Sequence, residues 1–150
     1  MAIAAEYPGA MTGTVEQIAI TLEESALPGT VDQVEVSATG ISGDRYAEKG
    51  DITLIEAEAI EAFTAETGIE LSHQESRRQV LTRGIRLGDL VGKRFTVGEV
   101  EVEGRELCEP CSHLQSLTRP GVLRGMVHRA GLNADIVTPG RIAVGDQVHG

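Results

Sequence analysis

Short stretches of alternating apolar and polar residues recur along the chain. In GTVEQIAITL (residues 13–22) the apolar positions include Val15, Ile18, Ile20 and Leu22, and their imperfect alternation predicts a half-buried strand near the edge of a sheet. TVDQVEVSA (30–38) alternates again after a Pro-Gly turn and predicts a second strand. The short apolar run ITLI then predicts a buried strand that leads into a helix.

One helix and one β-hairpin are also predicted. Residues 56–66 are rich in Ala and Glu and carry Ile60 and Phe63 on one face, and Gly68, which follows them, is a residue that commonly ends helices. In KRFTVGEVEVEGREL (93–107) two alternating stretches flank a Gly-Glu pair. This arrangement is typical of a hairpin.

The remaining segments complete a β-rich pattern. RRQVLTRGIRL (77–87) predicts a strand entering a glycine turn, and GRIAVGDQV (140–148) predicts C-terminal strands. Between them, CSHLQSLTRPGVLRGMVHRAG (111–131) has a helical composition interrupted by Pro120 and Gly121, so two short helices and one helix with a long loop fit equally well. Many short strands with one or two inserted helices predict a mostly β, α+β fold of the barrel type.

Length and composition favour one domain spanning residues 1–150. A chain of this size buries roughly two-thirds of the surface that it exposes when unfolded, and its 18 glycines suit many tight turns. Aromatic residues make up only 3% of the chain, which leaves little to stack on bases, and the formal net charge of −10 opposes a general attraction to phosphate backbones. We therefore expect no nucleic-acid partner.

The charges are unevenly distributed. Residues 1–76 carry 15 acidic side chains against 2 basic ones, whereas residues 77–150 carry 8 against 11. A solvated charged surface explains this distribution, and so does an anion-binding pocket in an otherwise acidic protein. Composition alone leaves both interpretations open.

The sequence contains no segment typical of a membrane span or a signal peptide. No stretch approaches the ~20 apolar residues of a spanning helix, and the N-terminal MAIAAEYPGA lacks the basic and apolar regions of a signal. We therefore expect a cytoplasmic protein with no membrane partner. Disulfides are unusual in the cytosol, so the two cysteines, Cys108 and Cys111, are expected to be reduced.

Both cysteines lie in RELCEPCSHL (105–114), and their spacing allows several interpretations. A thioredoxin-like redox site needs a βαβ setting, whereas a hairpin followed by a helix is predicted here. A structural zinc site would need ligands such as His113 and His128, at spacings that match no common zinc motif. Two small buried cysteines without a chemical role are a further alternative.

A reactive thiolate at Cys111 is the remaining interpretation. Pro110 suits the first turn of a helix, which would place Cys111 among the unpaired amides of that turn. A helix N-terminus and nearby arginines lower a thiol's pKa, and the thiolate is the form that attacks sulfur or binds a soft metal. Glu109 would oppose ionisation if it pointed inward, and His113 is a candidate base.

Taken together, these segments resemble a known family. The chain is similar to the MOSC domain, the module named for the C-terminal part of molybdenum cofactor sulfurase, in the order and spacing of GISGDRY, GDITLIEAEAIEAF, SRRQVLTRGIRLGDLVGKRFTVGEVEVEGRELCEPCSHL and HRAGLNADIVTPGRIAVGDQV. The resemblance spans about residues 13–148. It implies a MOSC-type β-barrel and a stand-alone, single-domain member of the family.

The resemblance also implies roles for individual residues. Cys111 matches the functional cysteine, which is proposed in this family to carry sulfur as a persulfide or to be a ligand to the molybdenum of the cofactor, while Cys108 matches a less general position. Asp44 and Arg45 match a loop motif with a structural or a functional role. The residues that would meet the anionic pterin cofactor are Arg77, Arg78, Arg83, His128 and Arg129.

These observations lead to a functional hypothesis. We expect a sulfur carrier or a molybdenum-cofactor-binding protein that acts through Cys111. If it is an enzyme, we expect sulfur transfer or molybdenum-dependent reduction of N-oxygenated compounds, with an external source of electrons. Its partners would be a cysteine desulfurase or another sulfur donor, or a reductase. The alternatives are a non-catalytic module that delivers an anionic cofactor, and a barrel with inert, buried cysteines.

Overall fold

The protein is built mainly from β-strands, as seen in a computed structural model that describes residues 12–23, 27–45, 47–109 and 121–150. The strands are β1 (Thr12–Ile20), β2 (Gly29–Val31), β3 (Gln33–Ser37), β4 (Gly40–Ile41), β5 (Asp51–Glu56), β6 (Val80–Arg83), β7 (Arg94–Val97), β8 (Val100–Leu107), β9 (Leu132–Thr138), β10 (Gly140–Ala143) and β11 (Gln147–His149). The α-helices are α1 (Ala57–Thr67), α2 (His73–Ser76) and α4 (Val122–Gly125), and Leu87–Leu90 forms a 3₁₀ turn.

Seven strands close into a barrel in the order β11-β7-β8-β9-β5-β6-β1, and pairing of β1 with β11 completes the ring. Strand β2 pairs with the far part of β1, outside the ring. Strands β5 and β6 pair in parallel, so they need a crossover connection, and α1 and α2 form it. The predicted mostly β barrel with inserted helices is confirmed.

Strand β1 explains why its sequence alternates imperfectly. The register against β6 shifts between Val15 and Gln17, which is the signature of a β-bulge that reverses the inward and outward positions. Val15 before the bulge and Ile18 after it are therefore both buried, although they are three residues apart. The expected position near a sheet edge is wrong, because β1 pairs with β6 along one side and with β11 and β2 along the other.

Two apolar clusters stabilise the fold. The larger one fills the barrel with aliphatic side chains and Phe95. The smaller one lies between the barrel and the helices and is centred on Phe63 of α1, which is fully buried against Val122 and Met126 of the α4 region. A Cβ at Gly125 would lie 2.2 Å from the Phe63 ring, so the glycine lets α4 pack directly on that ring.

The other predicted elements agree with the structure in most places. The helix expected at 56–66 is α1, which ends at Gly68 in the left-handed conformation, and the expected hairpin is formed by β7 and β8. The strand expected at 30–38 is instead divided into β2 and β3, which belong to different sheets. The prediction did not include β9 or α2.

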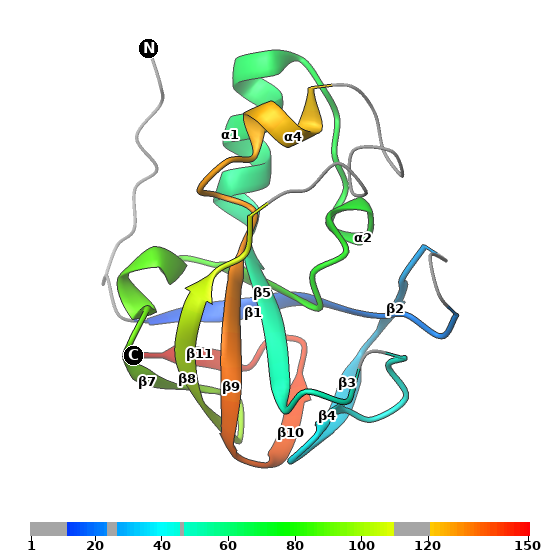
Figure 1. Ribbon diagram of the computed structural model, residues 1–150, viewed down its shortest axis with the longest axis vertical. Helices are drawn as coiled ribbons and strands as arrows, with labels where there is room; N and C mark the ends of the chain where they lie inside the picture. Colours follow the sequence, from blue (N-terminus) through cyan, green and yellow to red (C-terminus); the bar gives the residue numbers. More distant parts are fainter. Residues whose placement is uncertain (1–11, 24–26, 46, 110–120) are drawn as a thin grey trace.

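Figure 1 shows α1 and α4 together at one end of the barrel, and β3, β4 and β10 at the opposite end. Strand β8 ends and β9 begins at the helical end, and β5 runs directly into α1 there. The chain therefore gathers strand ends, helices and Cys108, which follows β8, at one end of the barrel. None of the helices among the described residues has the length and apolar character needed to cross a bilayer.

Candidate functional site

Arg77, Arg78 and Arg83 lie in one stretch of the chain, the basic segment. It begins at a hydrogen-bonded turn, α2. Ser72 and Glu75 form a capping box, in which the Ser72 hydroxyl accepts from the Glu75 N–H and the Glu75 carboxylate accepts from the Ser72 N–H. Arg77 ends the turn with φ 62°, a left-handed conformation, and its N–H donates to the Gln74 carbonyl. Arg78 is the next residue, and the chain then continues into β6.

Arg78 lies against the turn that opens β9. Its Nε donates to the Ala130 carbonyl at 2.6 Å, and its Cγ lies 3.4 Å from the position that a Cβ would take on Gly131. The side chain is half-buried, and no carboxylate in the described part of the chain forms an ion pair with it. The two terminal guanidinium nitrogens thus keep their N–H donors without a described anionic partner.

Cys108 is held by the same turn. Its N–H donates to the Gly131 carbonyl at 2.7 Å, immediately after β8 ends. Burial is the main reason why the pKa of the Cys108 thiol is raised above its ordinary value. The positive charge of Arg78 opposes this effect, while Glu106 and Asp51 add to it. The structure therefore brings Arg78 and Cys108 to two successive carbonyls of one turn, and it favours the neutral thiol at Cys108.

The predicted nucleophile, Cys111, lies outside the described residues, as do Pro110 and His113. The position of the preceding carboxylate is nevertheless defined. Glu109 accepts the backbone N–H of His128 at 2.7 Å through Oε1, and its Oε2 lies 3.0 Å from His128 Nδ1. His128 is exposed and has φ 65°. Glu109 and His128 thus connect the two ends of the segment that carries Cys111.

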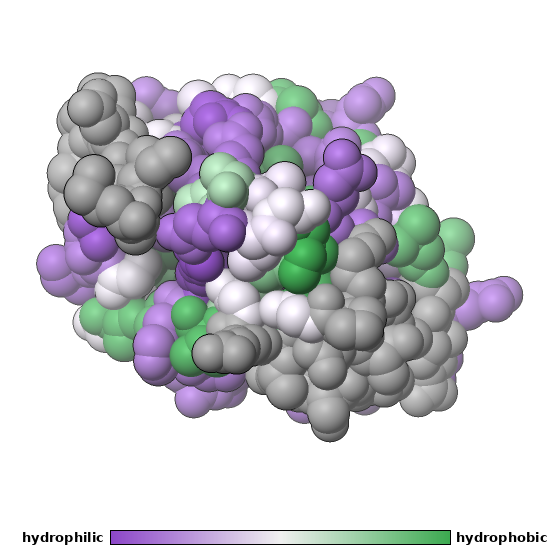
Figure 2. Space-filling view, turned by 90° about the horizontal axis from the view of Figure 1, so that it is seen from above, coloured by the Kyte–Doolittle hydropathy of each residue, from purple (hydrophilic) through white to green (hydrophobic). Residues whose placement is uncertain are grey.

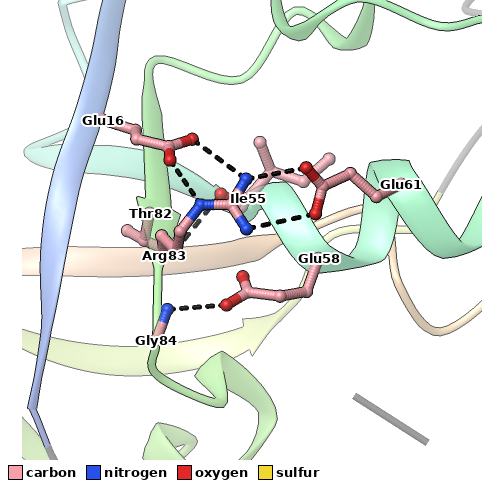
Figure 3. A network of polar contacts seen from close by, with 7 residues as sticks. All are labelled: Glu16, Ile55, Glu58, Glu61, Thr82, Arg83 and Gly84. Carbon is pink, nitrogen blue, oxygen red and sulfur yellow. Dashed lines mark hydrogen bonds and ion pairs between the residues drawn. The ribbon is translucent and has the colours of Figure 1, made fainter. Parts of the chain in front are cut away.

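Arg83, the third arginine of the basic segment, has a different environment. Its guanidinium bonds Glu16 of β1, and it forms a bidentate contact with Glu61 of α1 at 2.7 and 3.1 Å (Figure 3). The hydrogen bonds to these two carboxylates raise the pKa of Arg83. The hydrogen bond between Arg83 and Glu61 is also the main reason why the pKa of Glu61 is lowered. Next to it, the Gly84 N–H donates to Glu58 at 2.7 Å. Arg83 joins three elements of the fold and is separate from the Arg78 turn in its contacts.

Arg129 also has structural partners. Its Nε donates to the Gly125 carbonyl at 2.8 Å, and its guanidinium bonds Glu66 of α1. This hydrogen bond is the main reason why the pKa of Glu66 is lowered. Arg129 therefore connects the end of α4 to α1, next to Ala130.

The loop that carries Asp44 and Arg45 is fixed to the end of β1. Asp44 is buried, and its carboxylate accepts the Thr21 N–H at 3.1 Å, while the Arg45 N–H donates to the Thr21 carbonyl at 2.7 Å. These backbone contacts are those of a loop anchor. They favour the structural alternative of the two roles that the sequence left open for this motif.

The molecule also has a groove of about 610 Å³ between α1 and the segment before α2. It is lined in part by Ile60, Ala65, Leu71, Glu61, Glu70 and Glu75. No cysteine, histidine or basic side chain is present in this described lining, and Glu61 and Glu75 already have partners. The described lining of the groove thus offers neither a thiol nor a cation, and the turn of Arg78 and Cys108 is the better candidate.

Figure 2 looks onto the helical end of the molecule. Polar and neutral residues make up most of the coloured surface, and the apolar side chains form small, separate patches. Among the described residues, no group of three or more His, Cys, Asp and Glu side chains is placed to hold a metal ion. The distinguishing chemistry of this end is therefore the cationic side chain beside a thiol.

Sequence reasoning did not identify the groups that position this pair. Ala130 and Gly131 act through backbone carbonyls, which no side-chain pattern reveals. The capping box of α2 did have a signal, because SHQE has the Ser-x-x-Glu spacing of that motif.

Comparison with known proteins identifies the family. The model of the MOSC domain matches residues 42–149, a range that includes every predicted site residue. The chain belongs to the MOSC domain family. No curated protein matches the sequence of this MOSC protein.

Solved structures share the MOSC fold of this chain. The YuaD protein from Bacillus subtilis has a TM-score of 0.81 with 16% identity, over 92% of this chain and 94% of that one. YiiM from Geobacillus stearothermophilus has a TM-score of 0.71 with 14% identity, over 91% and 74%. YiiM from Escherichia coli has a TM-score of 0.68 with 15% identity, over 91% and 68%. At these identities the likeness shows the fold alone.

Proposed function

We propose that this MOSC protein carries sulfur or binds a molybdenum cofactor through Cys111, with Arg78 as the contact for an anionic group. The observation that carries the proposal is the half-buried guanidinium of Arg78, which lies beside Cys108 and has no carboxylate partner among the described residues. Family membership supports the choice of chemistry.

Arg78 has the properties of an anion receptor. Taking a charge partly out of water is costly unless an opposite charge compensates it. A half-buried arginine with no described carboxylate partner therefore suggests a partner that arrives with the ligand. Its Nε is fixed on the Ala130 carbonyl, which orients the remaining N–H donors. A planar guanidinium with two available nitrogens suits a phosphate or carboxylate through paired hydrogen bonds.

The two cysteines have different roles in this proposal. The raised pKa of Cys108 keeps that thiol protonated at neutral pH, which suits neither attack on sulfur nor binding of a soft metal. Cys111, three residues later, is proposed to supply the thiolate. The engagement of Glu109 by His128 supports this assignment, because it directs that carboxylate towards another partner.

Among the described residues, Arg78 has the chemistry that the phosphate of the pterin cofactor requires. Arg78 would hold its phosphate, and Cys111 would supply a sulfur ligand to its metal. When bound, the cofactor would supply a molybdenum centre for reduction of N-oxygenated compounds, with electrons from a reductase. As a sulfur carrier, the protein would instead receive sulfur on Cys111 from a cysteine desulfurase or another donor. A delivery module without turnover is the alternative, and we propose a cytoplasmic location for all three.

The test is the molybdenum content of purified protein, measured by plasma mass spectrometry, from cells supplied with molybdate and able to make the cofactor. We expect near-stoichiometric metal in the wild type, loss in Cys111→Ser, and a large decrease in Arg78→Gln. Arg83→Gln is the matched control, since it removes an arginine of the same segment that is bonded to Glu16 and Glu61. Cys108→Ser should retain most of the metal.

The outcomes separate the alternatives. Metal retained in Cys111→Ser would contradict its role as a ligand. If the wild type contains no metal, the mass of the peptide that carries Cys111 is measured next, and one added sulfur atom would indicate a carrier. Absence of both the metal and the added sulfur would contradict the proposal. Turnover with a supplied reductase distinguishes an enzyme from a delivery module.

A further inference from the structure

We infer that Ser76 is a positioning residue that sets Arg78 against the turn of Ala130 and Gly131, beside Cys108. The inference concerns how this site is built, and its functional meaning rests on the proposed function. The contacts of Ser76 and Arg78 do not depend on a cofactor, because all their atoms belong to described residues of the chain.

The Ser76 hydroxyl joins two parts of the backbone around α2. Its Oγ donates to the His73 carbonyl and accepts the Arg78 N–H at 3.3 Å. Ser76 is only 2% exposed, so water does not compete for these bonds. The Ser76 hydroxyl therefore links His73, at the start of α2, to Arg78.

The turn itself is anchored to the barrel. His73 is buried, and its Nδ1 lies 2.8 Å from the Gln17 Oε1 of β1. On the other side of Arg78, the Gln79 N–H donates to the Thr53 carbonyl at 3.1 Å, and the Gln79 side chain accepts the Thr53 N–H at 2.9 Å. The backbone of Arg78 is thus held between Ser76 and β5.

The guanidinium is then directed to the β9 turn. Arg78 Nε reaches the Ala130 carbonyl at 2.6 Å, and the next carbonyl along, that of Gly131, accepts the Cys108 N–H. Any movement of Arg78 away from this turn would remove a positive charge from the vicinity of the thiol. The pKa of Cys108 is therefore a direct report on the position of Arg78.

The experiment measures the thiol pKa of Cys108 from the pH dependence of alkylation by iodoacetamide. The full chain is used with Cys111→Ser, which leaves Cys108 as its single thiol, since the sequence has two cysteines. The protein is made without added molybdate, so the result is independent of cofactor loading. A failure here and a failure of the metal experiment are therefore distinguishable.

We expect Arg78→Gln to raise the pKa of Cys108 by about half a pH unit or more, as removal of a nearby opposite charge does. Ser76→Ala should raise it in the same direction by a smaller amount. Thr82→Val is the matched control, because it also removes a fully buried hydroxyl, one that bonds the Ile55 carbonyl at 3.4 Å rather than the backbone of Arg78.

An unchanged Cys108 pKa in Ser76→Ala, alongside a raised value in Arg78→Gln, would overturn the inference. An equal rise in Thr82→Val would also overturn it, since general loosening would then explain the effect. If Ser76→Ala does not fold, Gln17→Ala replaces it, because it removes the partner of His73 at the base of the same turn. That variant must also raise the pKa of Cys108 for the inference to stand.

Discussion

Arg78 and Arg83 lie five residues apart in one basic segment, yet their surroundings differ completely. Arg83 bonds Glu16 and Glu61, two carboxylates from other elements, at a partly exposed position. Arg78 bonds only a backbone carbonyl among its described side-chain contacts, and it is half-buried beside Cys108. The charge of Arg83 is thus compensated within the fold, whereas no carboxylate among the described residues compensates that of Arg78.

This difference separates the structural role of Arg83 from the ligand-binding role proposed for Arg78. A guanidinium between two carboxylates contributes to the fold and has little remaining attraction for a free anion. A guanidinium without such a partner retains its attraction, and its neighbours fix where the anion would bind. The segment is thus a stabilising contact at one end and a candidate receptor at the other.

The largest change should come from Gly131→Ala, which breaks the turn that holds both Arg78 and Cys108. Gly131 has φ 118°, and a Cβ there would lie 2.3 Å from the Leu54 carbonyl oxygen. Strain and overpacking together should lower the free energy of unfolding by about 3 to 5 kcal/mol. Urea unfolding monitored by circular dichroism measures this loss of unfolding free energy.

The control for that change is Gly29→Ala, where no atom lies within 4 Å of the new Cβ and φ is not positive. It should change stability by less than about 0.5 kcal/mol. Equal losses in the two variants would show that the β9 turn has no special constraint.

The second largest effect is a loss of stability at acidic pH, which is due to His73 in the turn α2 that precedes Arg78. Burial lowers the pKa of His73 from 6.5 to about 4, and the nearby backbone of Arg78 opposes this shift in part. Between these values the unfolded chain binds a proton that the folded protein does not, so stability falls as pH decreases through this window. The total loss should be about 3 kcal/mol, because each pH unit contributes about 1.4 kcal/mol.

Unfolding free energies at several pH values between 4 and 7 test this expectation. In His73→Gln the slope over this window should be much shallower than in the wild type. His149→Gln, which removes an exposed histidine on β11, is the control for the loss of a histidine as such. A wild-type slope in His73→Gln would exclude His73 as the cause.

Part of the fold could be predicted from the sequence alone. Alternation and turn residues predicted the hairpin of β7 and β8, the helix α1 with its stop at Gly68, and the barrel class. Local patterns specify these elements, because neighbours in sequence form them. Strand β9 was not predicted, since its exposed half, including Val137 at 38% exposure, departs from simple alternation.

The site was less accessible to sequence reasoning. The segment SRRQVLTRG predicts clustered positive charge, but not that Glu16, 67 positions away, and Glu61 meet Arg83. Long-range pairing decides which arginine keeps its charge available. The bulge in β1 has the same origin, because it is defined only by the register against β6.

A moderate effect is expected for Arg83→Gln. It should lower the free energy of unfolding by about 0.5 to 1 kcal/mol at neutral pH, since the contacts are partly exposed and screened by solvent. The pKa of Glu61 is held below 4.5 mainly by its hydrogen bond to Arg83, so this contribution is present above 4.5 and is lost as pH falls below it. Wild type and variant should therefore converge in acid.

Urea unfolding at neutral pH and at acidic pH measures the convergence. Arg94→Gln is the control, because Arg94 is more exposed and its contact with Glu101 is 3.9 Å. It should change stability less than Arg83→Gln at neutral pH. A constant difference between wild type and Arg83→Gln at all pH values would show that Glu61 is not the partner that matters.

The smallest effect on stability is expected for Arg78→Gln. The variant loses the bond to the Ala130 carbonyl, but it also removes a half-buried charge that has no described carboxylate partner, and these terms oppose each other. The free energy of unfolding should change by less than about 0.5 kcal/mol, although the same variant should lose most of the cofactor that we propose the protein binds. Arg83→Gln should show the opposite pattern, with reduced stability and retained cofactor. If Arg78→Gln were instead the more destabilising of the two, its guanidinium would have to be counted among the contacts that hold the fold, and the anion would need another receptor.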